Sequence, residues 1–152
     1  MADPPSLDRP PDISLHGDEH VRRYIETDGE VGYIYNGAPI LLLSYVGRRT
    51  GQVRTIPIIY TQVGDSSIVM ASKGGAPQHP LWYLSLLENP EVTIQIKAKR
   101  FPAIARTAVS PEREALWERA LVTWPRYALY QERASRTIPV VVLDPVPAAD
   151  AG

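Results

Sequence analysis

The chain has 152 residues, of which 44% are apolar and 22% are charged, and its formal net charge is -1. This length and composition are typical of one globular domain, and the near-neutral charge argues against a sequence-independent grip on nucleic acid. The chain contains no cysteine, which excludes disulfides, thiolate metal sites and cysteine nucleophiles.

The two ends of the chain differ in composition from the rest. Residues 1–17 are rich in Pro and Asp, so we expect a flexible tail there, a single domain over 18–145 and a second flexible tail over 146–152. The first residues lack the cationic and apolar regions of a signal peptide, and no later run reaches membrane-spanning length. We therefore expect a cytoplasmic protein.

The first element predicted after the tail is a short helix over residues 17–29. Its apolar side would carry Val21, Tyr24 and Ile25, with His20 on an exposed side. The helix also carries both arginines and acids, so any contact with a membrane would be peripheral. The stretch YIYNGAP that follows is expected to be a loop.

Strand patterns dominate the rest of the chain. The run at 40–46 is continuously apolar, which indicates a strand covered on both faces, and EVTIQIK alternates as a half-buried strand does. Turn residues separate these runs into hairpins. The predicted strands are 40–46, 55–63, 67–72, 91–97, 100–109 and 138–143.

Two helical segments interrupt the strands, at residues 79–89 and 110–136. In the second, Ser110 is a candidate N-cap with Pro111 at the first helical position, and Pro125 breaks or kinks the helix. About six strands in short hairpins, without a βαβ rhythm, predict a mainly β protein (α+β): a small antiparallel barrel with helices packed outside.

The turn GRRTGQVR, residues 47–54, gathers three arginines at one hairpin tip. Arginine offers a planar fork of donors suited to phosphate or carboxylate, and the glycines let a ligand approach the backbone. A solvated hairpin tip is the alternative.

The stretch MASKGGAPQHP, residues 70–80, joins a strand to a helix through Lys73, Gly74 and Gly75. Consecutive backbone N–H groups in such a turn form an anion-binding nest, and the following helix start adds favourable potential. The Walker pattern is absent. A glycine-rich connector is the alternative.

The segment TWPRYALYQERASR places Trp124, Tyr127 and Tyr130 three residues apart, on one helix face. Such a stripe belongs to a core or forms a wall over a planar ligand. The three histidines share no metal-ligand spacing, and no nucleophile elbow or triad is marked, so we expect no metal site. Cofactor chemistry is then the better enzyme hypothesis.

Taken together, these three stretches resemble the deazaflavin-dependent nitroreductase family, and the resemblance covers residues from about 20 to 145. It implies a split β-barrel of the FMN-binding, flavin-reductase type that binds coenzyme F420, whose tail carries a phosphodiester and several glutamates. The sequence departs from the family pattern at Val53, Ser85 and Trp124, where proline, asparagine and tyrosine respectively are frequent.

The resemblance also implies roles for individual residues. The basic turn would face the phosphate and carboxylate tail, and the A-S-K-G-G and P-x-W-Y stretches would contact the phosphate and the ring. The implied cofactor-binding residues are Arg48, Arg49, Thr50, Arg54, Pro57, Ala71, Ser72, Lys73, Gly74, Pro80, Leu81 and Trp82. The implied substrate wall is Trp124, Tyr127 and Tyr130, and the candidate catalytic hydroxyls are Ser72, Tyr127 and Tyr130.

The first functional hypothesis is an oxidoreductase in which reduced coenzyme F420 gives hydride to a quinone, an activated enone or a nitroaromatic. The second is an FMN-dependent reductase on the same fold, although three arginines and a lysine exceed what one phosphate needs. The third is a non-catalytic cofactor carrier. Small-molecule acceptors are the expected partners, nucleic acid is not expected, and monomer and homodimer both stay open.

Overall fold

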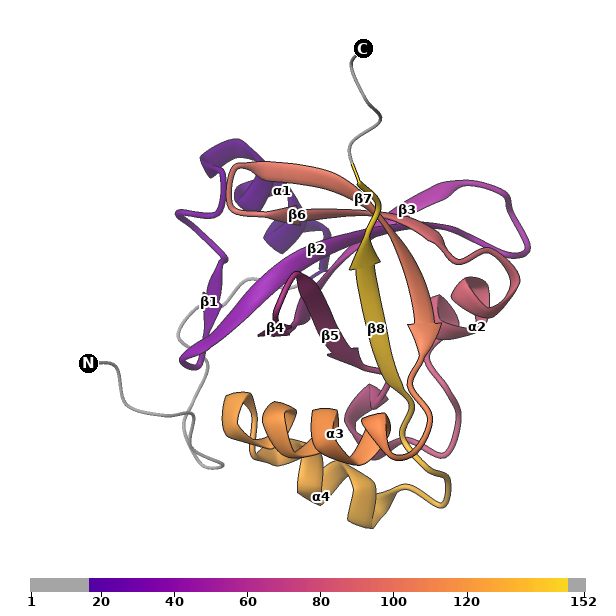
Figure 1. Ribbon diagram of the computed structural model, residues 1–152. Coiled ribbons are helices and arrows are strands. Elements are labelled where there is room, and N and C mark those ends of the chain that lie inside the picture. The colour runs from indigo at the N-terminus through magenta and orange to yellow at the C-terminus, as the bar shows by residue number, and fades with distance from the viewer. Residues whose placement is uncertain (1–16, 148–152) are drawn as a thin grey trace.

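Eight strands pair into one curled antiparallel sheet in the computed structural model, which describes residues 17–147 (Figure 1). The strand order is β1-β2-β6-β7-β8-β5-β4, and β3 pairs with β2. The strands are β1 (Ile34–Tyr35), β2 (Ala38–Val46), β3 (Val53–Ile59), β4 (Thr61–Val63), β5 (Ser66–Met70), β6 (Glu91–Ile96), β7 (Lys99–Thr107) and β8 (Val140–Pro145). The predicted fold class, a split antiparallel barrel with helices outside, is confirmed.

The continuous apolar runs of the sequence are strands that are buried on both faces. In β8, Val141 and Leu143 point into one core cluster, whereas Val140 and Val142 point into another, as the two-residue period of a strand requires. In β2, Leu41 and Leu43 join the first of these clusters, whereas Ile40 and Leu42 pack against Tyr24 of the first helix. Apolar side chains therefore cover both faces of the curled sheet.

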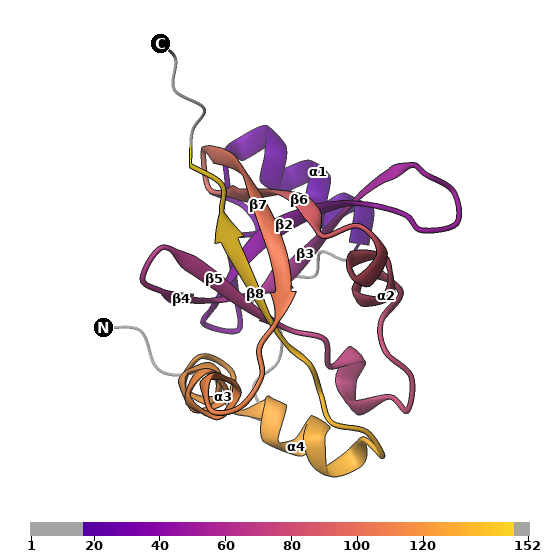
Figure 2. The same cartoon turned by 45° about the vertical axis from the view of Figure 1, so that its right-hand side comes forward.

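Helices cover the outside of the sheet at separate places (Figures 1 and 2). Helix α1 (Gly17–Thr27) packs on β2 and β3, α2 (Leu81–Glu88) lies beside the β2–β3 hairpin, and α3 (Glu112–Thr123) packs with α4 (Arg126–Arg133) across the end of β5 and β8. A short 3-10 turn, η1 (Lys73–Gly75), connects β5 to α2. None of the helices between residues 17 and 147 has the length and apolar character needed to cross a bilayer.

The structure differs from the sequence prediction at three places along the strands and helices. The stretch YIYNGAP contains the short strand β1 instead of only a loop, and the predicted strand 55–63 divides at Tyr60, which is buried and donates its backbone N–H to the Pro39 carbonyl at 3.1 Å. Ser110 does not cap α3. The helix begins at Glu112, and the Ser110 hydroxyl donates to the Glu114 carboxylate instead.

The prediction that His20 is exposed was wrong. Its side chain is buried, and its Nε2 lies 2.8 Å from the carbonyl oxygen of Gly32. Residue 20 lies one helical turn before Tyr24, so the two share the face of α1 that packs on the sheet. Ile25, expected on that face, is 41% exposed. The predicted tails, 1–17 and 146–152, lie outside the described residues except for Gly17, Val146 and Pro147.

Candidate functional site

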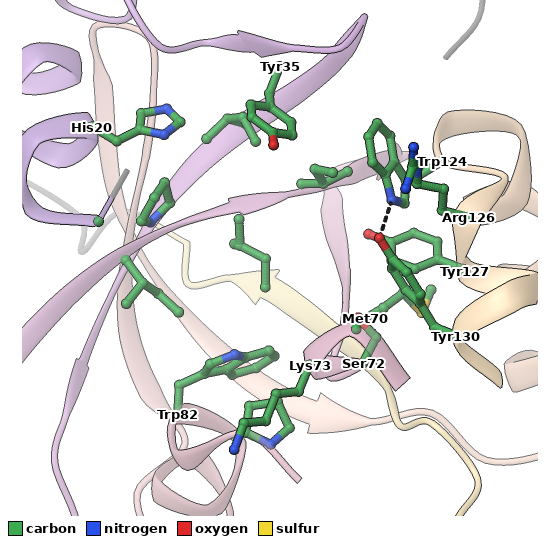
Figure 3. A pocket seen from close by; sticks show the side chains of 18 of the residues that line it. His20, Tyr35, Met70, Ser72, Lys73, Trp82, Trp124, Arg126, Tyr127 and Tyr130 are labelled. Atoms are coloured by element: carbon green, nitrogen blue, oxygen red, sulfur yellow. Dashed lines mark hydrogen bonds between the residues drawn. The ribbon is translucent and has the colours of Figure 1, made fainter. Parts of the chain in front are cut away.

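A cleft of about 790 Å³ opens between β3 and the helices α2 and α4. This volume falls within the range of roughly 300–1,000 Å³ that is usual for small-molecule and cofactor sites. The β2–β3 hairpin, the loop after β5, the start of α2 and the start of α4 each contribute side chains (Figure 3). Ten of the residues singled out from the sequence line it: Pro57, Ser72, Lys73, Gly74, Pro80, Leu81, Trp82, Trp124, Tyr127 and Tyr130.

The floor of the cleft is the loop from Ala71 to Ala76, where the chain turns sharply. Lys73, Gly74 and Gly75 all have positive φ angles, of 47°, 64° and 87°. The carbonyl of Ser72 accepts a hydrogen bond from the N–H of Gly75 at 2.9 Å, which closes the turn. Open space lies where a Gly74 side chain would project. A ligand can therefore approach the loop backbone closely at Gly74, beside the ammonium of Lys73.

The wall of the cleft at α4 is aromatic. Trp124 and Tyr127 are almost fully buried and pack against β5 and β8, while Tyr130 is half-buried and lines the cleft. The rings of Tyr127 and Tyr130 meet edge to face at 6.1 Å. Burial, and then the neighbouring Tyr130, raise the pKa of Tyr127, so its hydroxyl stays protonated at neutral pH.

Two further residues of the cleft carry a charge or an imidazole, and the sequence did not indicate either as a site residue. Arg126, the first residue of α4, has its guanidinium 5.9 Å from the ring of Trp124, and its buried Nε has no hydrogen-bond partner among residues 17–147. His20 reaches the cleft from α1, across from the α4 wall (Figure 3). An arginine that follows a proline belongs to no motif, so the sequence does not indicate that Arg126 lines a cleft. The position of His20 depends on how α1 packs on the sheet, which the sequence does not show either.

The basic turn lies beyond the cleft, at the tip of the β2–β3 hairpin. The N–H of Gly47 donates to the Gln52 carbonyl and the N–H of Gly51 donates to the Gly47 carbonyl, both at 2.8 Å, which closes the turn. The N–H of Arg48 donates to the hydroxyl of Ser85 at 3.1 Å. Ser85 thus anchors the turn to α2. The guanidinium of Arg48 also lies 3.7 Å from the carboxylate of Glu88.

The remaining implied cofactor residues are therefore spread around the cleft instead of lining it. Arg48, Arg49 and Thr50 lie on the hairpin tip, and Arg54 lines a neighbouring groove between β3 and α1. Ala71 is fully buried beneath the loop. The arrangement is one cleft with a polar floor, an aromatic wall and a basic turn beyond one end.

Another arginine supports the floor from outside the cleft and was also missed from the sequence. Arg136 donates side-chain hydrogen bonds to the carbonyl oxygens of Ala71, Ser72 and Ala76. These partners are about sixty residues away in the chain, so no local pattern indicates the contact.

A family model and a curated relative both match most of this chain. A family model described as F420H(2)-dependent quinone reductase matches residues 17–145. An F420H(2)-dependent quinone reductase of Mycobacterium tuberculosis (strain H37Rv) is 41% identical over 128 residues, which are 82% of this chain and 86% of that protein.

Solved structures agree with this match. An F420-H2-dependent reductase superposes with a TM-score of 0.66 at 36% identity, over 70% of this chain and 94% of that one. A domain-swapped dimer superposes with a TM-score of 0.69 at 35% identity, over 83% of this chain and 95% of that one.

Proposed function

Since this chain belongs to the F420H(2)-dependent quinone reductase family, it is an F420-dependent reductase, and we propose that coenzyme and acceptor meet in the cleft between β3 and α4. The observation that carries this proposal is the meeting, in one cleft, of a ligand-accessible glycine loop and an aromatic wall that come from distant parts of the chain.

The residues present suit the two ends of coenzyme F420. The cleft is large enough for a flat ring, and Trp82 and Pro57 give it apolar sides. The open backbone at Gly74 and the ammonium of Lys73 suit a phosphodiester. Leu81 is 70% exposed at the rim of the cleft, on the helix whose later residues Ser85 and Glu88 contact the basic turn. A tail of carboxylates that passes along α2 would therefore reach Arg48 and Arg49.

When bound, reduced coenzyme F420 supplies a hydride from C5 of its deazaflavin ring. A quinone that has taken up a hydride carries a negative charge on oxygen and needs one proton. The hydroxyls of Tyr130 and Ser72 line the cleft and are able to donate a hydrogen bond to that oxygen, and the guanidinium of Arg126 is a positive charge at the same wall.

The protein's other contribution is an apolar surface at the acceptor side. Trp124 and Tyr127 are buried within the wall, so the charge of the half-buried Arg126 beside them acts more strongly than it would in bulk water. Tyr127 keeps its proton because its pKa is raised, which suits a hydrogen-bond donor and not a base. The cytoplasm, with peripheral contact to membranes that hold lipid-soluble quinones, is the proposed location.

The test is a fluorescence titration of oxidised coenzyme F420 with the protein, repeated with FMN. We expect saturable binding of the deazaflavin in the micromolar range or tighter, and much weaker binding of FMN. Steady-state reduction of a soluble quinone such as menadione by reduced coenzyme then separates an enzyme from a carrier. Tight binding of FMN together with no binding of coenzyme F420 would overturn the proposal.

A further inference from the structure

We propose that Arg136 is a positioning residue that locks the loop Ala71–Ala76 to helix α4, so that the coenzyme-binding floor and the acceptor wall behave as one unit. The lock itself is a property of the protein alone. Its consequence for catalysis rests on the proposed function.

The first link is the guanidinium of Arg136. Its Nη2 donates to the Ser72 carbonyl at 2.9 Å, its Nη1 to the Ala71 carbonyl at 3.1 Å and its Nε to the Ala76 carbonyl at 3.1 Å. Nη1 also lies 2.9 Å from Nδ1 of His79, which must be the acceptor because arginine only donates. One side chain therefore holds both ends of the loop. All four partners are uncharged acceptors, so its positive charge is not cancelled and adds to that of Lys73.

The second link is a direct contact between the loop and α4. A Cβ atom on Gly75 would lie only 2.7 Å from the carbonyl oxygen of Tyr130 and 3.0 Å from Cβ of Arg133. Gly75 is buried and has a φ angle of 87°, so both the space and the backbone conformation require glycine. The loop thus touches α4 at the residue whose hydroxyl lines the acceptor side.

The third link returns from Arg136 to the same helix. Gln131 of α4 donates its side-chain amide to the carbonyl of Arg136 at 2.8 Å and accepts from the N–H of Ile138 at 2.9 Å. The backbone that carries Arg136 is therefore fixed to α4, while its side chain is fixed to the loop. A movement of the loop is passed to α4 through Gly75 on one side and through Arg136 and Gln131 on the other.

These three links together have a consequence for ligand binding. An anion that settles on the backbone at Ser72–Gly74 restrains the loop, and the restraint is shared with α4 and therefore with Tyr127 and Tyr130. Coenzyme binding and acceptor binding should then favour each other, and by linkage the effect must be reciprocal.

The test compares Arg136→Lys with Arg113→Lys as a matched control. Arg113 also donates to a backbone carbonyl, that of Ile138 at 2.9 Å, and within residues 17–147 its guanidinium has no hydrogen bond to the loop. We expect Arg136→Lys to weaken coenzyme F420 binding about tenfold in the fluorescence titration and Arg113→Lys to leave it unchanged. The KM for menadione should also rise in Arg136→Lys, beyond any change in Arg113→Lys.

Amide hydrogen exchange of the ligand-free proteins tests the lock without any coenzyme. In Arg136→Lys, exchange should become faster both in residues 72–76 and in α4, whereas Arg113→Lys should change neither. Gln131→Met removes the hydrogen bonds that join α4 to the backbone of Arg136 and Ile138, and leaves the Arg136 side chain in place. It should also speed exchange in both the loop and α4. The test therefore stays decisive if one of the two variants folds poorly.

Faster exchange in the loop with α4 unchanged, in both Arg136→Lys and Gln131→Met, would overturn the lock. If the wild-type protein does not bind coenzyme F420, the proposed function fails, yet the exchange experiment on the ligand-free protein still decides whether loop and helix are joined.

Discussion

The indole N–H of Trp124 donates a hydrogen bond to the hydroxyl oxygen of Tyr130 across 3.4 Å (Figure 3). The hydroxyl proton of Tyr130 must then point elsewhere, and the cleft is open to it. We expect Tyr130→Phe to lower kcat for menadione by about tenfold to a hundredfold, the effect of losing one hydrogen bond to a charged atom. The Kd of oxidised coenzyme F420 should stay within about twofold.

Trp124→Phe is the companion to that variant. It keeps an aromatic ring in the buried position but removes the donor that orients Tyr130. The expected loss in kcat is smaller, about two- to fivefold. Equal turnover of Tyr130→Phe and wild type would remove Tyr130 from the mechanism, and a larger loss in Trp124→Phe than in Tyr130→Phe would show that the indole acts on the acceptor directly.

Arg126 is expected to select for acceptors that develop negative charge. Replacement by methionine keeps much of the length of the side chain and removes its charge. We expect Arg126→Met to lower kcat/KM for menadione about tenfold with little change in coenzyme affinity. Arg119→Met, on the exposed side of α3, is the control. Equal losses in the two variants would show that Arg126 acts through general surface charge.

The basic turn is expected to bind the anionic tail of the coenzyme, and Glu88 competes for Arg48 at 3.7 Å. Arg49→Gln should weaken coenzyme binding a few fold and reduce its dependence on salt, because one exposed cation is lost. Glu88→Gln should strengthen binding, since it removes an opposing carboxylate. Titrations at two salt concentrations check both. Weaker binding by Glu88→Gln would mean that the Arg48–Glu88 pair holds the turn in its binding shape.

Stability should depend on the protonation of His79. Burial, and then the positive Arg136, lower the pKa of His79 below its ordinary value of 6.5, and its Nδ1 accepts from Arg136. The unfolded chain therefore binds the proton more readily, and the free energy of unfolding should fall as the pH decreases from about 7.5 to about 5.5.

Urea unfolding of wild type and His79→Gln across this range measures the effect. The variant should show a flatter pH profile. The hydrogen bond to Arg106 holds the pKa of Glu112 below its ordinary value. Burial raises the pKa of Asp144, but hydrogen bonds from Ser66 and Arg106 outweigh this and lower it, so both carboxyls stay ionised throughout the range. Parallel profiles of the two proteins would show that the His79 proton is not linked to folding.

The sequence predicts most of the sheet because its strands follow simple patterns. The alternating stretch 91–97 corresponds to β6, and the apolar runs at 40–46 and 138–143 correspond to β2 and β8, in each case within two residues at either end. The division at Tyr60 was not predictable, because it depends on the Pro39 carbonyl of a distant strand. The prediction for His20 failed for a similar reason. The pattern of polar residues in α1 does not show which side of the helix faces the sheet.

For the candidate site, the sequence indicated residues that belong to motifs and did not indicate residues that act across the fold. Ser72, Lys73 and Gly74 belong to a recognisable loop, and Tyr127 and Tyr130 share a helix face, and all five line the cleft. The hydrogen bonds of Arg136 join residues that are 57 to 65 positions apart in the chain, so they depend on the tertiary fold. Local spacing carries no information about such contacts.

The acceptor wall comes entirely from the excursion between β7 and β8, which contains α3 and α4. The glycine loop comes from another connection, between β5 and α2, and the paired strand residues within 17–147 belong to neither connection. We therefore expect substitutions around Arg126 to alter which acceptor is reduced while the strand pairing stays the same, whereas Trp124 is restricted because it packs against β5 and β8. Substitution is also limited at Tyr130, whose backbone must keep its fit against Gly75.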